Sequence, residues 1–273
     1  MNKGLYFWKS SFVPNKKQGI MLGIILVIIL AATAGWYFLV YTPHKKHDLE
    51  LQNKKTALEQ QIKQVSTFYE DQLKGGSIDR FSLLLNEMYK SRLVLGLTGY
   101  NEIGFSCKTD NCTFSYVIKP SHVFNVQKKI FWGKSYSSSF SNKGISFSGI
   151  PAKLNDNIVL QHYSKGKNID AADCGQVLSY IYAFNSINKK SDQITIVKPP
   201  ASSVLDVEEK IKGNTKYYGL LFGSWTVKAK DDIVHLMSLF ERQAFRDSFI
   251  IKGIEFKSKE VKISGGFVCK SGN

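Results

Sequence analysis

The chain has 273 residues, of which 43% are hydrophobic and 22% charged, and its formal net charge is +15. This apolar content excludes an intrinsically disordered chain, and the length allows one large domain or two small ones. A positive charge can attract nucleic acid or anionic lipid headgroups. The lysines are scattered, however, with no run longer than two and no arginine cluster. We therefore interpret the charge as a soluble basic surface and expect no nucleic-acid partner.

One segment departs from this globular pattern. From Gly19 to Val40 the sequence reads GIMLGIILVIILAATAGWYFLV, which contains no charged residue. As a helix it would be roughly 33 Å long, enough to cross the hydrocarbon core of a bilayer. Ala32-Thr33-Ala34 resembles a signal-peptide cleavage site, but the apolar run exceeds the roughly 7–15 residues of a cleavable signal. We therefore predict a transmembrane helix over residues 19–41.

The flanks of this segment predict its orientation. Residues 1–18 carry four lysines and no acidic residue, as expected for a cytoplasmic tail under the positive-inside rule. All four cysteines follow the segment, and an even number of cysteines is typical of an oxidising compartment. The sequence thus predicts a single-pass protein of a bacterial inner membrane, with its N-terminus in the cytoplasm and its C-terminal domain in the periplasm.

Residues 44–74 are polar and lack proline and glycine, which predicts a helical stalk. Apolar residues recur along it at steps of 7, 4, 3 and 4: Leu51, Leu58, Ile62, Val65 and Tyr69. Heptad spacing is typical of a short coiled coil, and we expect these residues to contact a second copy or a homologous partner. The alternative is a solvated stalk that only holds the next domain away from the membrane. Gly75 and Gly76 are expected to end the helix.

Two stretches beyond the stalk share one predicted order of elements, α-β-β-α-β-β. In the first, residues 78–150, we expect a helix over 81–95, strands over 102–108 and 112–119, a short helix from 120 to about 131, and a hairpin over 134–141 and 144–150. Residues 151–173 are the expected linker.

The second stretch covers residues 174–270. Its predicted elements are a helix over 174–187, strands over 193–198 and 217–229, a helix after Asp231-Asp232 that ends at 245, and a hairpin over 249–258 and 260–269, with a helix-like insertion in 199–213. Two helices and four strands compose a two-layer sandwich. We therefore predict the α+β class, with two tandem ferredoxin-like modules.

The four cysteines are expected to form two disulfides. Cys107 and Cys112 flank a short turn between two predicted strands, where opposite Cα atoms lie roughly 4.5–5.5 Å apart. The sequence lacks the C-x-x-C spacing of a redox site and a second close pair of zinc ligands. Because the first pair is local, Cys174 is left to pair with Cys269, joining the first helix of the second module to its last strand.

No motif points to catalysis. The sequence contains no G-x-S-x-G, P-loop, G-x-G-x-x-G or H-E-x-x-H pattern. Asp231 and Asp232 could form a carboxylate pair, but acidic residues at a helix N-terminus explain them better. His44 and His47 fit a solvated cluster at the membrane exit, and His235 a partly covered helix position. We therefore expect no enzymatic activity, no cofactor and no metal site.

Three motifs of the C-terminal third resemble a known family. They are WTVKA (Trp225–Ala229), which precedes a helix containing Leu236, Leu239 and Phe240, then SFIIKGIEF (Ser248–Phe256) and VKISGGFVCK (Val261–Lys270). With the tail, the membrane helix and the stalk, they resemble the PilO-like pilin accessory proteins of type IVb pili. These belong to the PilN/PilO class of bitopic inner-membrane alignment proteins and are related to type II secretion subunits. The chain departs from the family pattern at Val261-Lys262, where tryptophan is common, and at Val268, where an aromatic residue is common.

The resemblance implies an inner-membrane scaffold or assembly factor of a type IVb pilus machine. Its partners would be itself or a homologous bitopic protein, other pilus inner-membrane subunits, pilin or the secretin complex. Phe131-Trp132 and the strand Ser135–Phe140 are candidate contacts. The alternatives are a bitopic subunit of a type II secretion or conjugation channel, and a membrane-anchored periplasmic sensor that binds a ligand in a cleft between the modules.

Overall fold

The computed structural model describes residues 16–122, 125–142, 144–257 and 260–272. The chain divides into two units, one that ends at Gln60 and one that begins at Gln61. Residues 1–15 of the predicted cytoplasmic tail lie outside the described residues.

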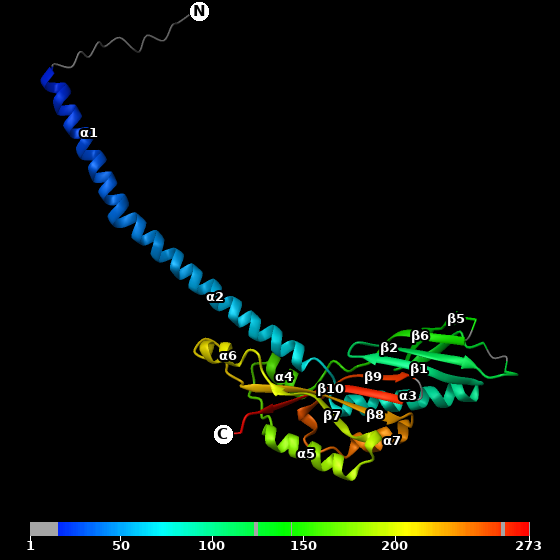
Figure 1. Cartoon of the computed structure of the whole chain (residues 1–273). Helices are drawn as coiled ribbons and strands as arrows, with labels where there is room; N and C mark the ends of the chain where they lie inside the picture. Colours follow the sequence, from blue (N-terminus) through cyan, green and yellow to red (C-terminus); the bar gives the residue numbers. More distant parts are fainter. Residues whose placement is uncertain (1–15, 123–124, 143, 258–259, 273) are drawn as a thin grey trace, which may run out of the picture. The chain divides into compact units, whose positions relative to one another are not determined.

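The first unit is helical (Figure 1). It contains α1 (Lys16–Trp36), the π-helical turn η1 (Tyr37–Tyr41) and the first part of α2 (Thr42–Leu73), whose last turns belong to the second unit. In the part of the chain that the structure describes, one helix near the N-terminus is long and apolar enough to cross a membrane. In η1, the N–H of Thr42 donates to the carbonyl of Tyr37, five residues back. Pro43 follows at once and has no N–H, which accounts for the local widening of the helix.

The second unit is built on an antiparallel sheet of eight strands in the order β5-β6-β2-β1-β9-β10-β8-β7. Its strands are β1 (Tyr100–Lys108), β2 (Asn111–Ile118), β5 (Ser139–Ser141), β6 (Gly144–Pro151), β7 (Ile194–Ala201), β8 (Leu220–Lys230), β9 (Phe249–Lys257) and β10 (Glu260–Lys270). A separate hairpin pairs β3 (Lys128–Phe131) with β4 (Lys134–Ser137).

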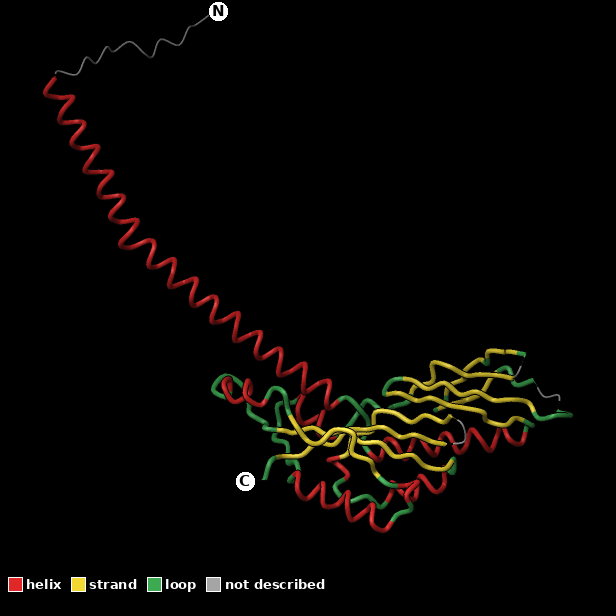
Figure 2. The backbone as a smooth tube through the Cα atoms, viewed as in Figure 1, coloured by secondary structure: helices red, strands yellow, loops and turns green. Residues whose placement is uncertain are grey.

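Three helices lie along one face of this sheet (Figures 1 and 2): α3 (Ile78–Leu97), α5 (Cys174–Ile187) and α7 (Ile233–Glu241). The short helices are α4 (Ile158–Ser164), α6 (Leu205–Ile211), η2 (Lys190–Asp192) and η3 (Arg246–Ser248). Polar side chains cap the starts of α3, α4, α5 and α7. At α7, Asp232 of the predicted acidic pair accepts a hydrogen bond from the N–H of His235, 3.1 Å away. The fold is therefore α+β, as predicted.

The two predicted modules share one sheet. The strands β5-β6-β2-β1 all come from residues 100–151, and β9-β10-β8-β7 all come from residues 194–270. The two quartets meet where β1 pairs with β9 over four residue pairs, from Phe105 opposite Phe256 to Lys108 opposite Gly253. Their buried side chains also belong to one hydrophobic cluster. The linker, residues 151–173, is not a bare connection, because it contains α4.

The predicted helix over 120–131 is wrong. Residues 128–131 instead form β3, which turns back into β4 through Trp132 and Gly133. Both turn residues have positive φ (53° and 76°), the conformation of a tight hairpin turn that matches strand twist. The side chain of Phe131 is buried against Phe114 and Phe147, with ring centroids 5.4 and 5.6 Å away. Core packing thus holds this segment as a hairpin.

The second half follows its predicted order: α5, β7, β8, α7, β9, β10, with α6 in the insertion. The helix α5 has the predicted bounds, whereas α7 ends at Glu241, four residues before the predicted end. Phe245 has a left-handed backbone, which is incompatible with a continued helix.

Both cysteine pairs lie at disulfide distance. Cys107 is linked to Cys112 across the turn between β1 and β2, and Cys174 at the start of α5 is linked to Cys269 of β10. The Cα atoms are 4.0 Å apart in the first pair and 4.9 Å apart in the second. The pairing expected from the sequence is the one that the structure contains.

Replacing Cys174 should reveal how much the long link contributes. Cys174→Ser opens a loop between residues 95 positions apart, and we expect the free energy of unfolding to fall by about 2–4 kcal/mol, because the link restricts the unfolded chain. Urea unfolding of the full chain in detergent measures this change. The matched control, Cys107→Ser with Cys112→Ser, opens a much shorter loop and should cost less. An unchanged midpoint for Cys174→Ser would contradict the assignment.

Candidate functional site

The five predicted coiled-coil residues have different surroundings. Leu51 is exposed, whereas Leu58 and Ile62 are half-buried. Val65 and Tyr69 are buried by the chain's own second unit, and Tyr69 has no exposed surface. The expectation that Val65 and Tyr69 face a partner helix is therefore wrong. A coiled coil stays a prediction for the N-terminal part of the stripe.

Tyr69 anchors the end of α2 in the second unit. Its hydroxyl donates to Glu208 Oε2 at 2.8 Å and accepts from the N–H of Leu220 at 3.2 Å. The side chain of Glu208 also accepts from the backbone of Tyr218 at 2.6 Å and of Gly219 at 3.3 Å. A fully buried carboxylate is tolerated only when such donors surround it. Burial and the adjacent carboxylate raise the pKa of Tyr69, so the phenol keeps its proton and donates it.

A second buried polar residue closes the end of α2. Asn157 Nδ2 donates to the carbonyls of Leu73 at 2.8 Å and Gly75 at 2.9 Å, which lack partners within the helix. Its Oδ1 accepts from the N–H of Leu160 and so caps α4. Gly76, three residues after the last residue of α2, exchanges two hydrogen bonds with Ile251 of β9, at 2.9 and 2.8 Å. The chain is thus bonded to the middle of the sheet shortly after the stalk helix ends.

This anchor can be tested by removing one oxygen atom. We expect Tyr69→Phe to lower the free energy of unfolding by about 1–3 kcal/mol, because Glu208 loses a donor in a site that water does not reach. Urea unfolding of the full chain in detergent provides the measurement. Tyr217→Phe, at a residue 45% exposed, is the control and should change stability little. Equal effects of the two substitutions would argue against the anchor.

A partly buried ionic cluster lies at the joint between the two quartets. Arg92 of α3 donates through Nε to Glu102 of β1 and through Nη2 to Asp231, 2.5 Å away. Its guanidinium lies 5.6 Å from the ring centroid of Phe105 and 5.9 Å from that of Phe256, the residues that face each other where β1 meets β9. The predicted acidic pair is therefore divided: Asp232 caps α7, and Asp231 pairs with Arg92.

The surroundings of Glu102 shift its ionisation. Burial raises the pKa of this carboxyl to about 7, against the opposing effect of Arg92, and the nearby Asp231 adds to the rise. Tyr116 also faces Glu102, and burial raises the pKa of its phenol. The hydroxyl of Tyr116 is 3.1 Å from that of Ser91. The guanidinium of Arg92 therefore binds two carboxylates, Glu102 and Asp231. Glu102, the more deeply buried of the two, has its pKa near neutrality.

This cluster should make stability depend on pH. Because the pKa of Glu102 is raised from 4.5 to about 7 on folding, the folded chain keeps a proton that the unfolded chain releases, and stability falls as pH rises through this interval. We expect Glu102→Gln to flatten this fall in urea unfolding between about pH 5 and 7. Glu255→Gln, at an exposed carboxylate, should keep the wild-type slope. The same slope in all three proteins would contradict the assignment.

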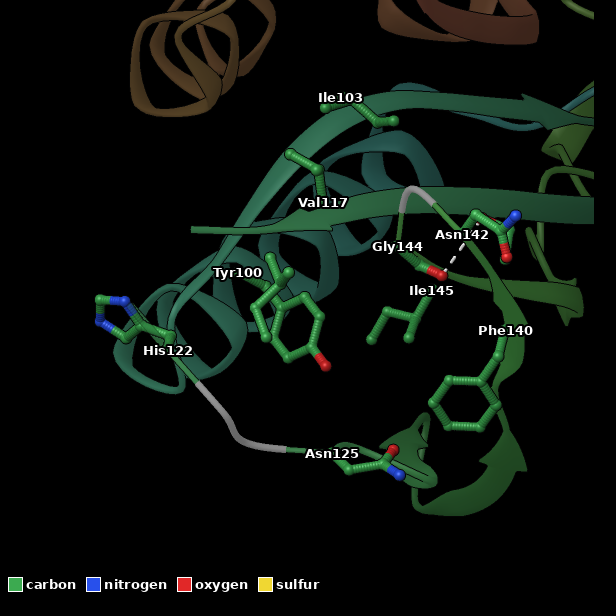
Figure 3. A pocket seen from close by; sticks show the side chains of 11 residues that line it. Tyr100, Ile103, Val117, His122, Asn125, Phe140, Asn142, Gly144 and Ile145 are labelled. Carbon is green, nitrogen blue, oxygen red and sulfur yellow. Dashed lines mark hydrogen bonds between the residues drawn. The ribbon is translucent and has the colours of Figure 1, made fainter. Parts of the chain in front are cut away.

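A pocket of about 620 Å³ lies beside the edge strand β5 (Figure 3). Phe140 of β5, Ile145 of β6 and Tyr100 of β1 face the hollow, and His122 and Asn125 lie across it. The ring of His122 is held by its own segment, with Nδ1 3.1 Å from the carbonyl oxygen of Pro120. The pocket belongs to the first quartet alone, so it is not the cleft between modules that a sensor was expected to have.

The contact residues predicted from the sequence differ in how far the structure exposes them. Phe131 is buried and serves the chain's own core, so its expected role as a contact residue is wrong. Trp132 is partly buried and donates through Nε1 to the carbonyl of Pro151 at 2.7 Å, and a contact through its exposed part stays a prediction. The expected strand Ser135–Phe140 is divided between β4 and β5. Phe140 is 56% exposed and lies on β5, the last strand of the sheet.

The other histidines singled out in the sequence lie away from the pocket lining. His235 Nε2 lies 3.1 Å from Asp192 Oδ2, which is largely buried. His44 and His47 are exposed. Over the described ranges, no group of three or more His, Cys, Asp or Glu side chains could hold a metal ion.

No protein-family model, curated protein or solved structure matches the chain. The resemblance to the PilO-like proteins therefore rests on the sequence motifs, which lie on β8, α7, β9 and β10.

Proposed function

We propose that the chain is an inner-membrane scaffold of a type IVb pilus assembly machine, which acts through protein–protein contacts and catalyses no reaction. The observation that carries this proposal is the anchor of α2: Tyr69 bonds the helix end to Glu208 of α6 and Leu220 of β8, and Asn157 bonds it to the start of α4, all through buried polar contacts. A protein that only tethers a domain to a membrane needs no such rigid attachment. A scaffold does, because the contact surfaces on its sheet must stay joined to the end of the stalk helix.

We assign both quartets to the ferredoxin-like topology. The second quartet has the order β9-β10-β8-β7 with α5 before β7 and α7 before β9, and the first has the equivalent order β5-β6-β2-β1 after α3. The β3–β4 hairpin stands where the second helix of the first module was expected. This equivalence supports two modules of one kind, as in the family that the sequence resembles.

The proposed location is a bacterial inner membrane, with residues 1–18 in the cytoplasm and the sheet in the periplasm. The apolar helix near the N-terminus and two disulfides after it support this assignment, since disulfides persist in oxidising compartments. The proposed partners are a second copy or a homologous bitopic protein at Leu51 and Leu58, and other pilus subunits, pilin or the secretin complex at the sheet. No cofactor or nucleic acid takes part.

Photo-crosslinking in cells tests this proposal. A photoreactive residue at Leu58 or at Ser137, which is exposed on β4, is expected to yield adducts with pilus or secretion subunits, identified by mass spectrometry. Val65 is the matched control, because it lies on the same helix stripe but is buried and should give adducts only within the chain. Adducts of secretion-channel subunits would move the protein to that machine. Loss of all partner adducts, with a small molecule copurifying, would replace the scaffold by a sensor.

A further inference from the structure

The two edges of the eight-stranded sheet differ in their capacity to accept another strand. β7 ends one side and contains Pro199 and Pro200, which have no backbone N–H to donate. Its pairing with β8 also shifts register twice, between Ile196 and Lys198 and between Lys198 and Ala201. β5 ends the other side with the sequence Ser-Phe-Ser, which has no proline and no charge. Prolines and irregular register are devices that protect a sheet edge, and they protect only β7.

The second quartet shows how a strand can be added at the position equivalent to β5. In the second quartet, β9 holds the place that β5 holds in the first, and β9 accepts β1 as its neighbour. That joint needs only four residue pairs. A three-residue edge strand is therefore close in length to the pairing that this architecture uses between its own halves.

An apolar hollow adjoins the β5 edge. Phe140 is 56% exposed, and Ile103 and Ile118, which also line the pocket of about 620 Å³, are exposed as well. A strand laid along β5 would direct alternate side chains to one face of the sheet. Apolar side chains at those positions could cover Phe140 and enter the hollow, while the backbone bonds to the edge.

Charge decides what kind of segment fits. Residues 111–150, which include β2 and the strands β3 to β6, contain five lysines and not one aspartate or glutamate. Of these lysines, Lys128 and Lys134 are exposed. A second copy would bring this acid-free, lysine-containing segment against itself at β5, or offer the proline-bearing edge β7. An acidic segment of another protein meets neither obstacle.

We infer that β5 and the adjoining pocket bind an extended segment of a partner protein, in which apolar and acidic residues alternate, as an added strand of the sheet. This inference rests on the proposed scaffold function and deepens it by stating the chemistry of one partner. The backbone of the segment supplies the edge hydrogen bonds, its apolar side chains cover Phe140, and its carboxylates pair with the exposed lysines of the β3–β4 hairpin, Lys128 and Lys134.

Hydrogen exchange on the full chain in lipid nanodiscs tests the inference. The probe is an amidated peptide of about ten residues, the upper length of common strands, in which valine and aspartate alternate. At millimolar concentration it is expected to slow exchange at least about tenfold in the segment containing Ser139 and Phe140, as a bound strand would. No change in exchange at β5 would overturn the inference.

Two control peptides test the acidic preference and the strand addition separately. A peptide of alternating valine and lysine should leave exchange at β5 unchanged, and equal protection by it would overturn the acidic preference. The valine–aspartate peptide with N-methyl groups on alternate amides cannot complete the edge hydrogen bonds. Equal protection by this peptide would overturn strand addition.

Two protein variants locate the contact. Phe140→Asp should abolish protection by removing the apolar contact and opposing the carboxylates of the peptide. Ile187→Asp, at a residue 83% exposed at the end of α5, should leave protection intact. Equal loss in both variants would place the binding elsewhere.

Photo-crosslinking in cells tests the scaffold function and hydrogen exchange tests strand addition, so either claim can be contradicted without the other. Partner adducts from Leu58 and Ser137 without peptide protection of β5 would leave the scaffold standing and remove strand addition. Peptide protection without any pilus or secretion adducts would keep the edge as a binding site and remove the assignment to such a machine.

Discussion

The pairing of β1 with β9 is the contact on which the rest of this structure depends. Four residue pairs convert two quartets of strands, each built from its own segment of the chain, into one sheet. Without it, both strands would be open edges, which natural proteins avoid. Arg92 reinforces the joint because it stacks near one aromatic residue from each strand and binds carboxylates from both halves. The joint is thus covered by a cation that takes one carboxylate partner, Glu102, from its own half and the other, Asp231, from the second half.

The prediction from local sequence patterns succeeded in the second half because residues within each element specify that element. α5 begins after the capping residue Asp173, and β9 and β10 contain several β-branched and aromatic residues, so propensity and packing favour the same structure. In the first half, the segment before Phe131 is short and its turn is Trp132-Gly133, which lacks the common Asn-Gly or Asp-Gly signature. What fixes the segment is contact with Phe114 and Phe147, which no local pattern reveals.

The stalk shows a different limit of predicting contacts from the spacing of apolar residues. Heptad spacing correctly indicated that Val65 and Tyr69 lie on the covered side of a helix, but spacing does not say which surface covers them. Their cover is the chain itself, through Glu208 of α6, which is 139 residues away from Tyr69. Glu208 and Asn157 carried no sequence signal of their own. Each is an ordinary surface residue type until a distant segment supplies its hydrogen-bond partners.

The same backbone contacts also connect the edge of the sheet to the stalk. From β5, hydrogen-bonded pairings lead through β6, β2 and β1 to β9, and Gly76, next to the end of α2, bonds to β9 at Ile251. The path stays within one unit and crosses no flexible connection, because every step is a strand pairing. A side chain at either glycine after α2 would break it, since a Cβ on Gly75 would lie 2.3 Å from Ile250 and one on Gly76 would lie 2.9 Å from the backbone of Leu154. The two glycines that end the stalk are therefore also the residues that let it approach the sheet closely enough to bond.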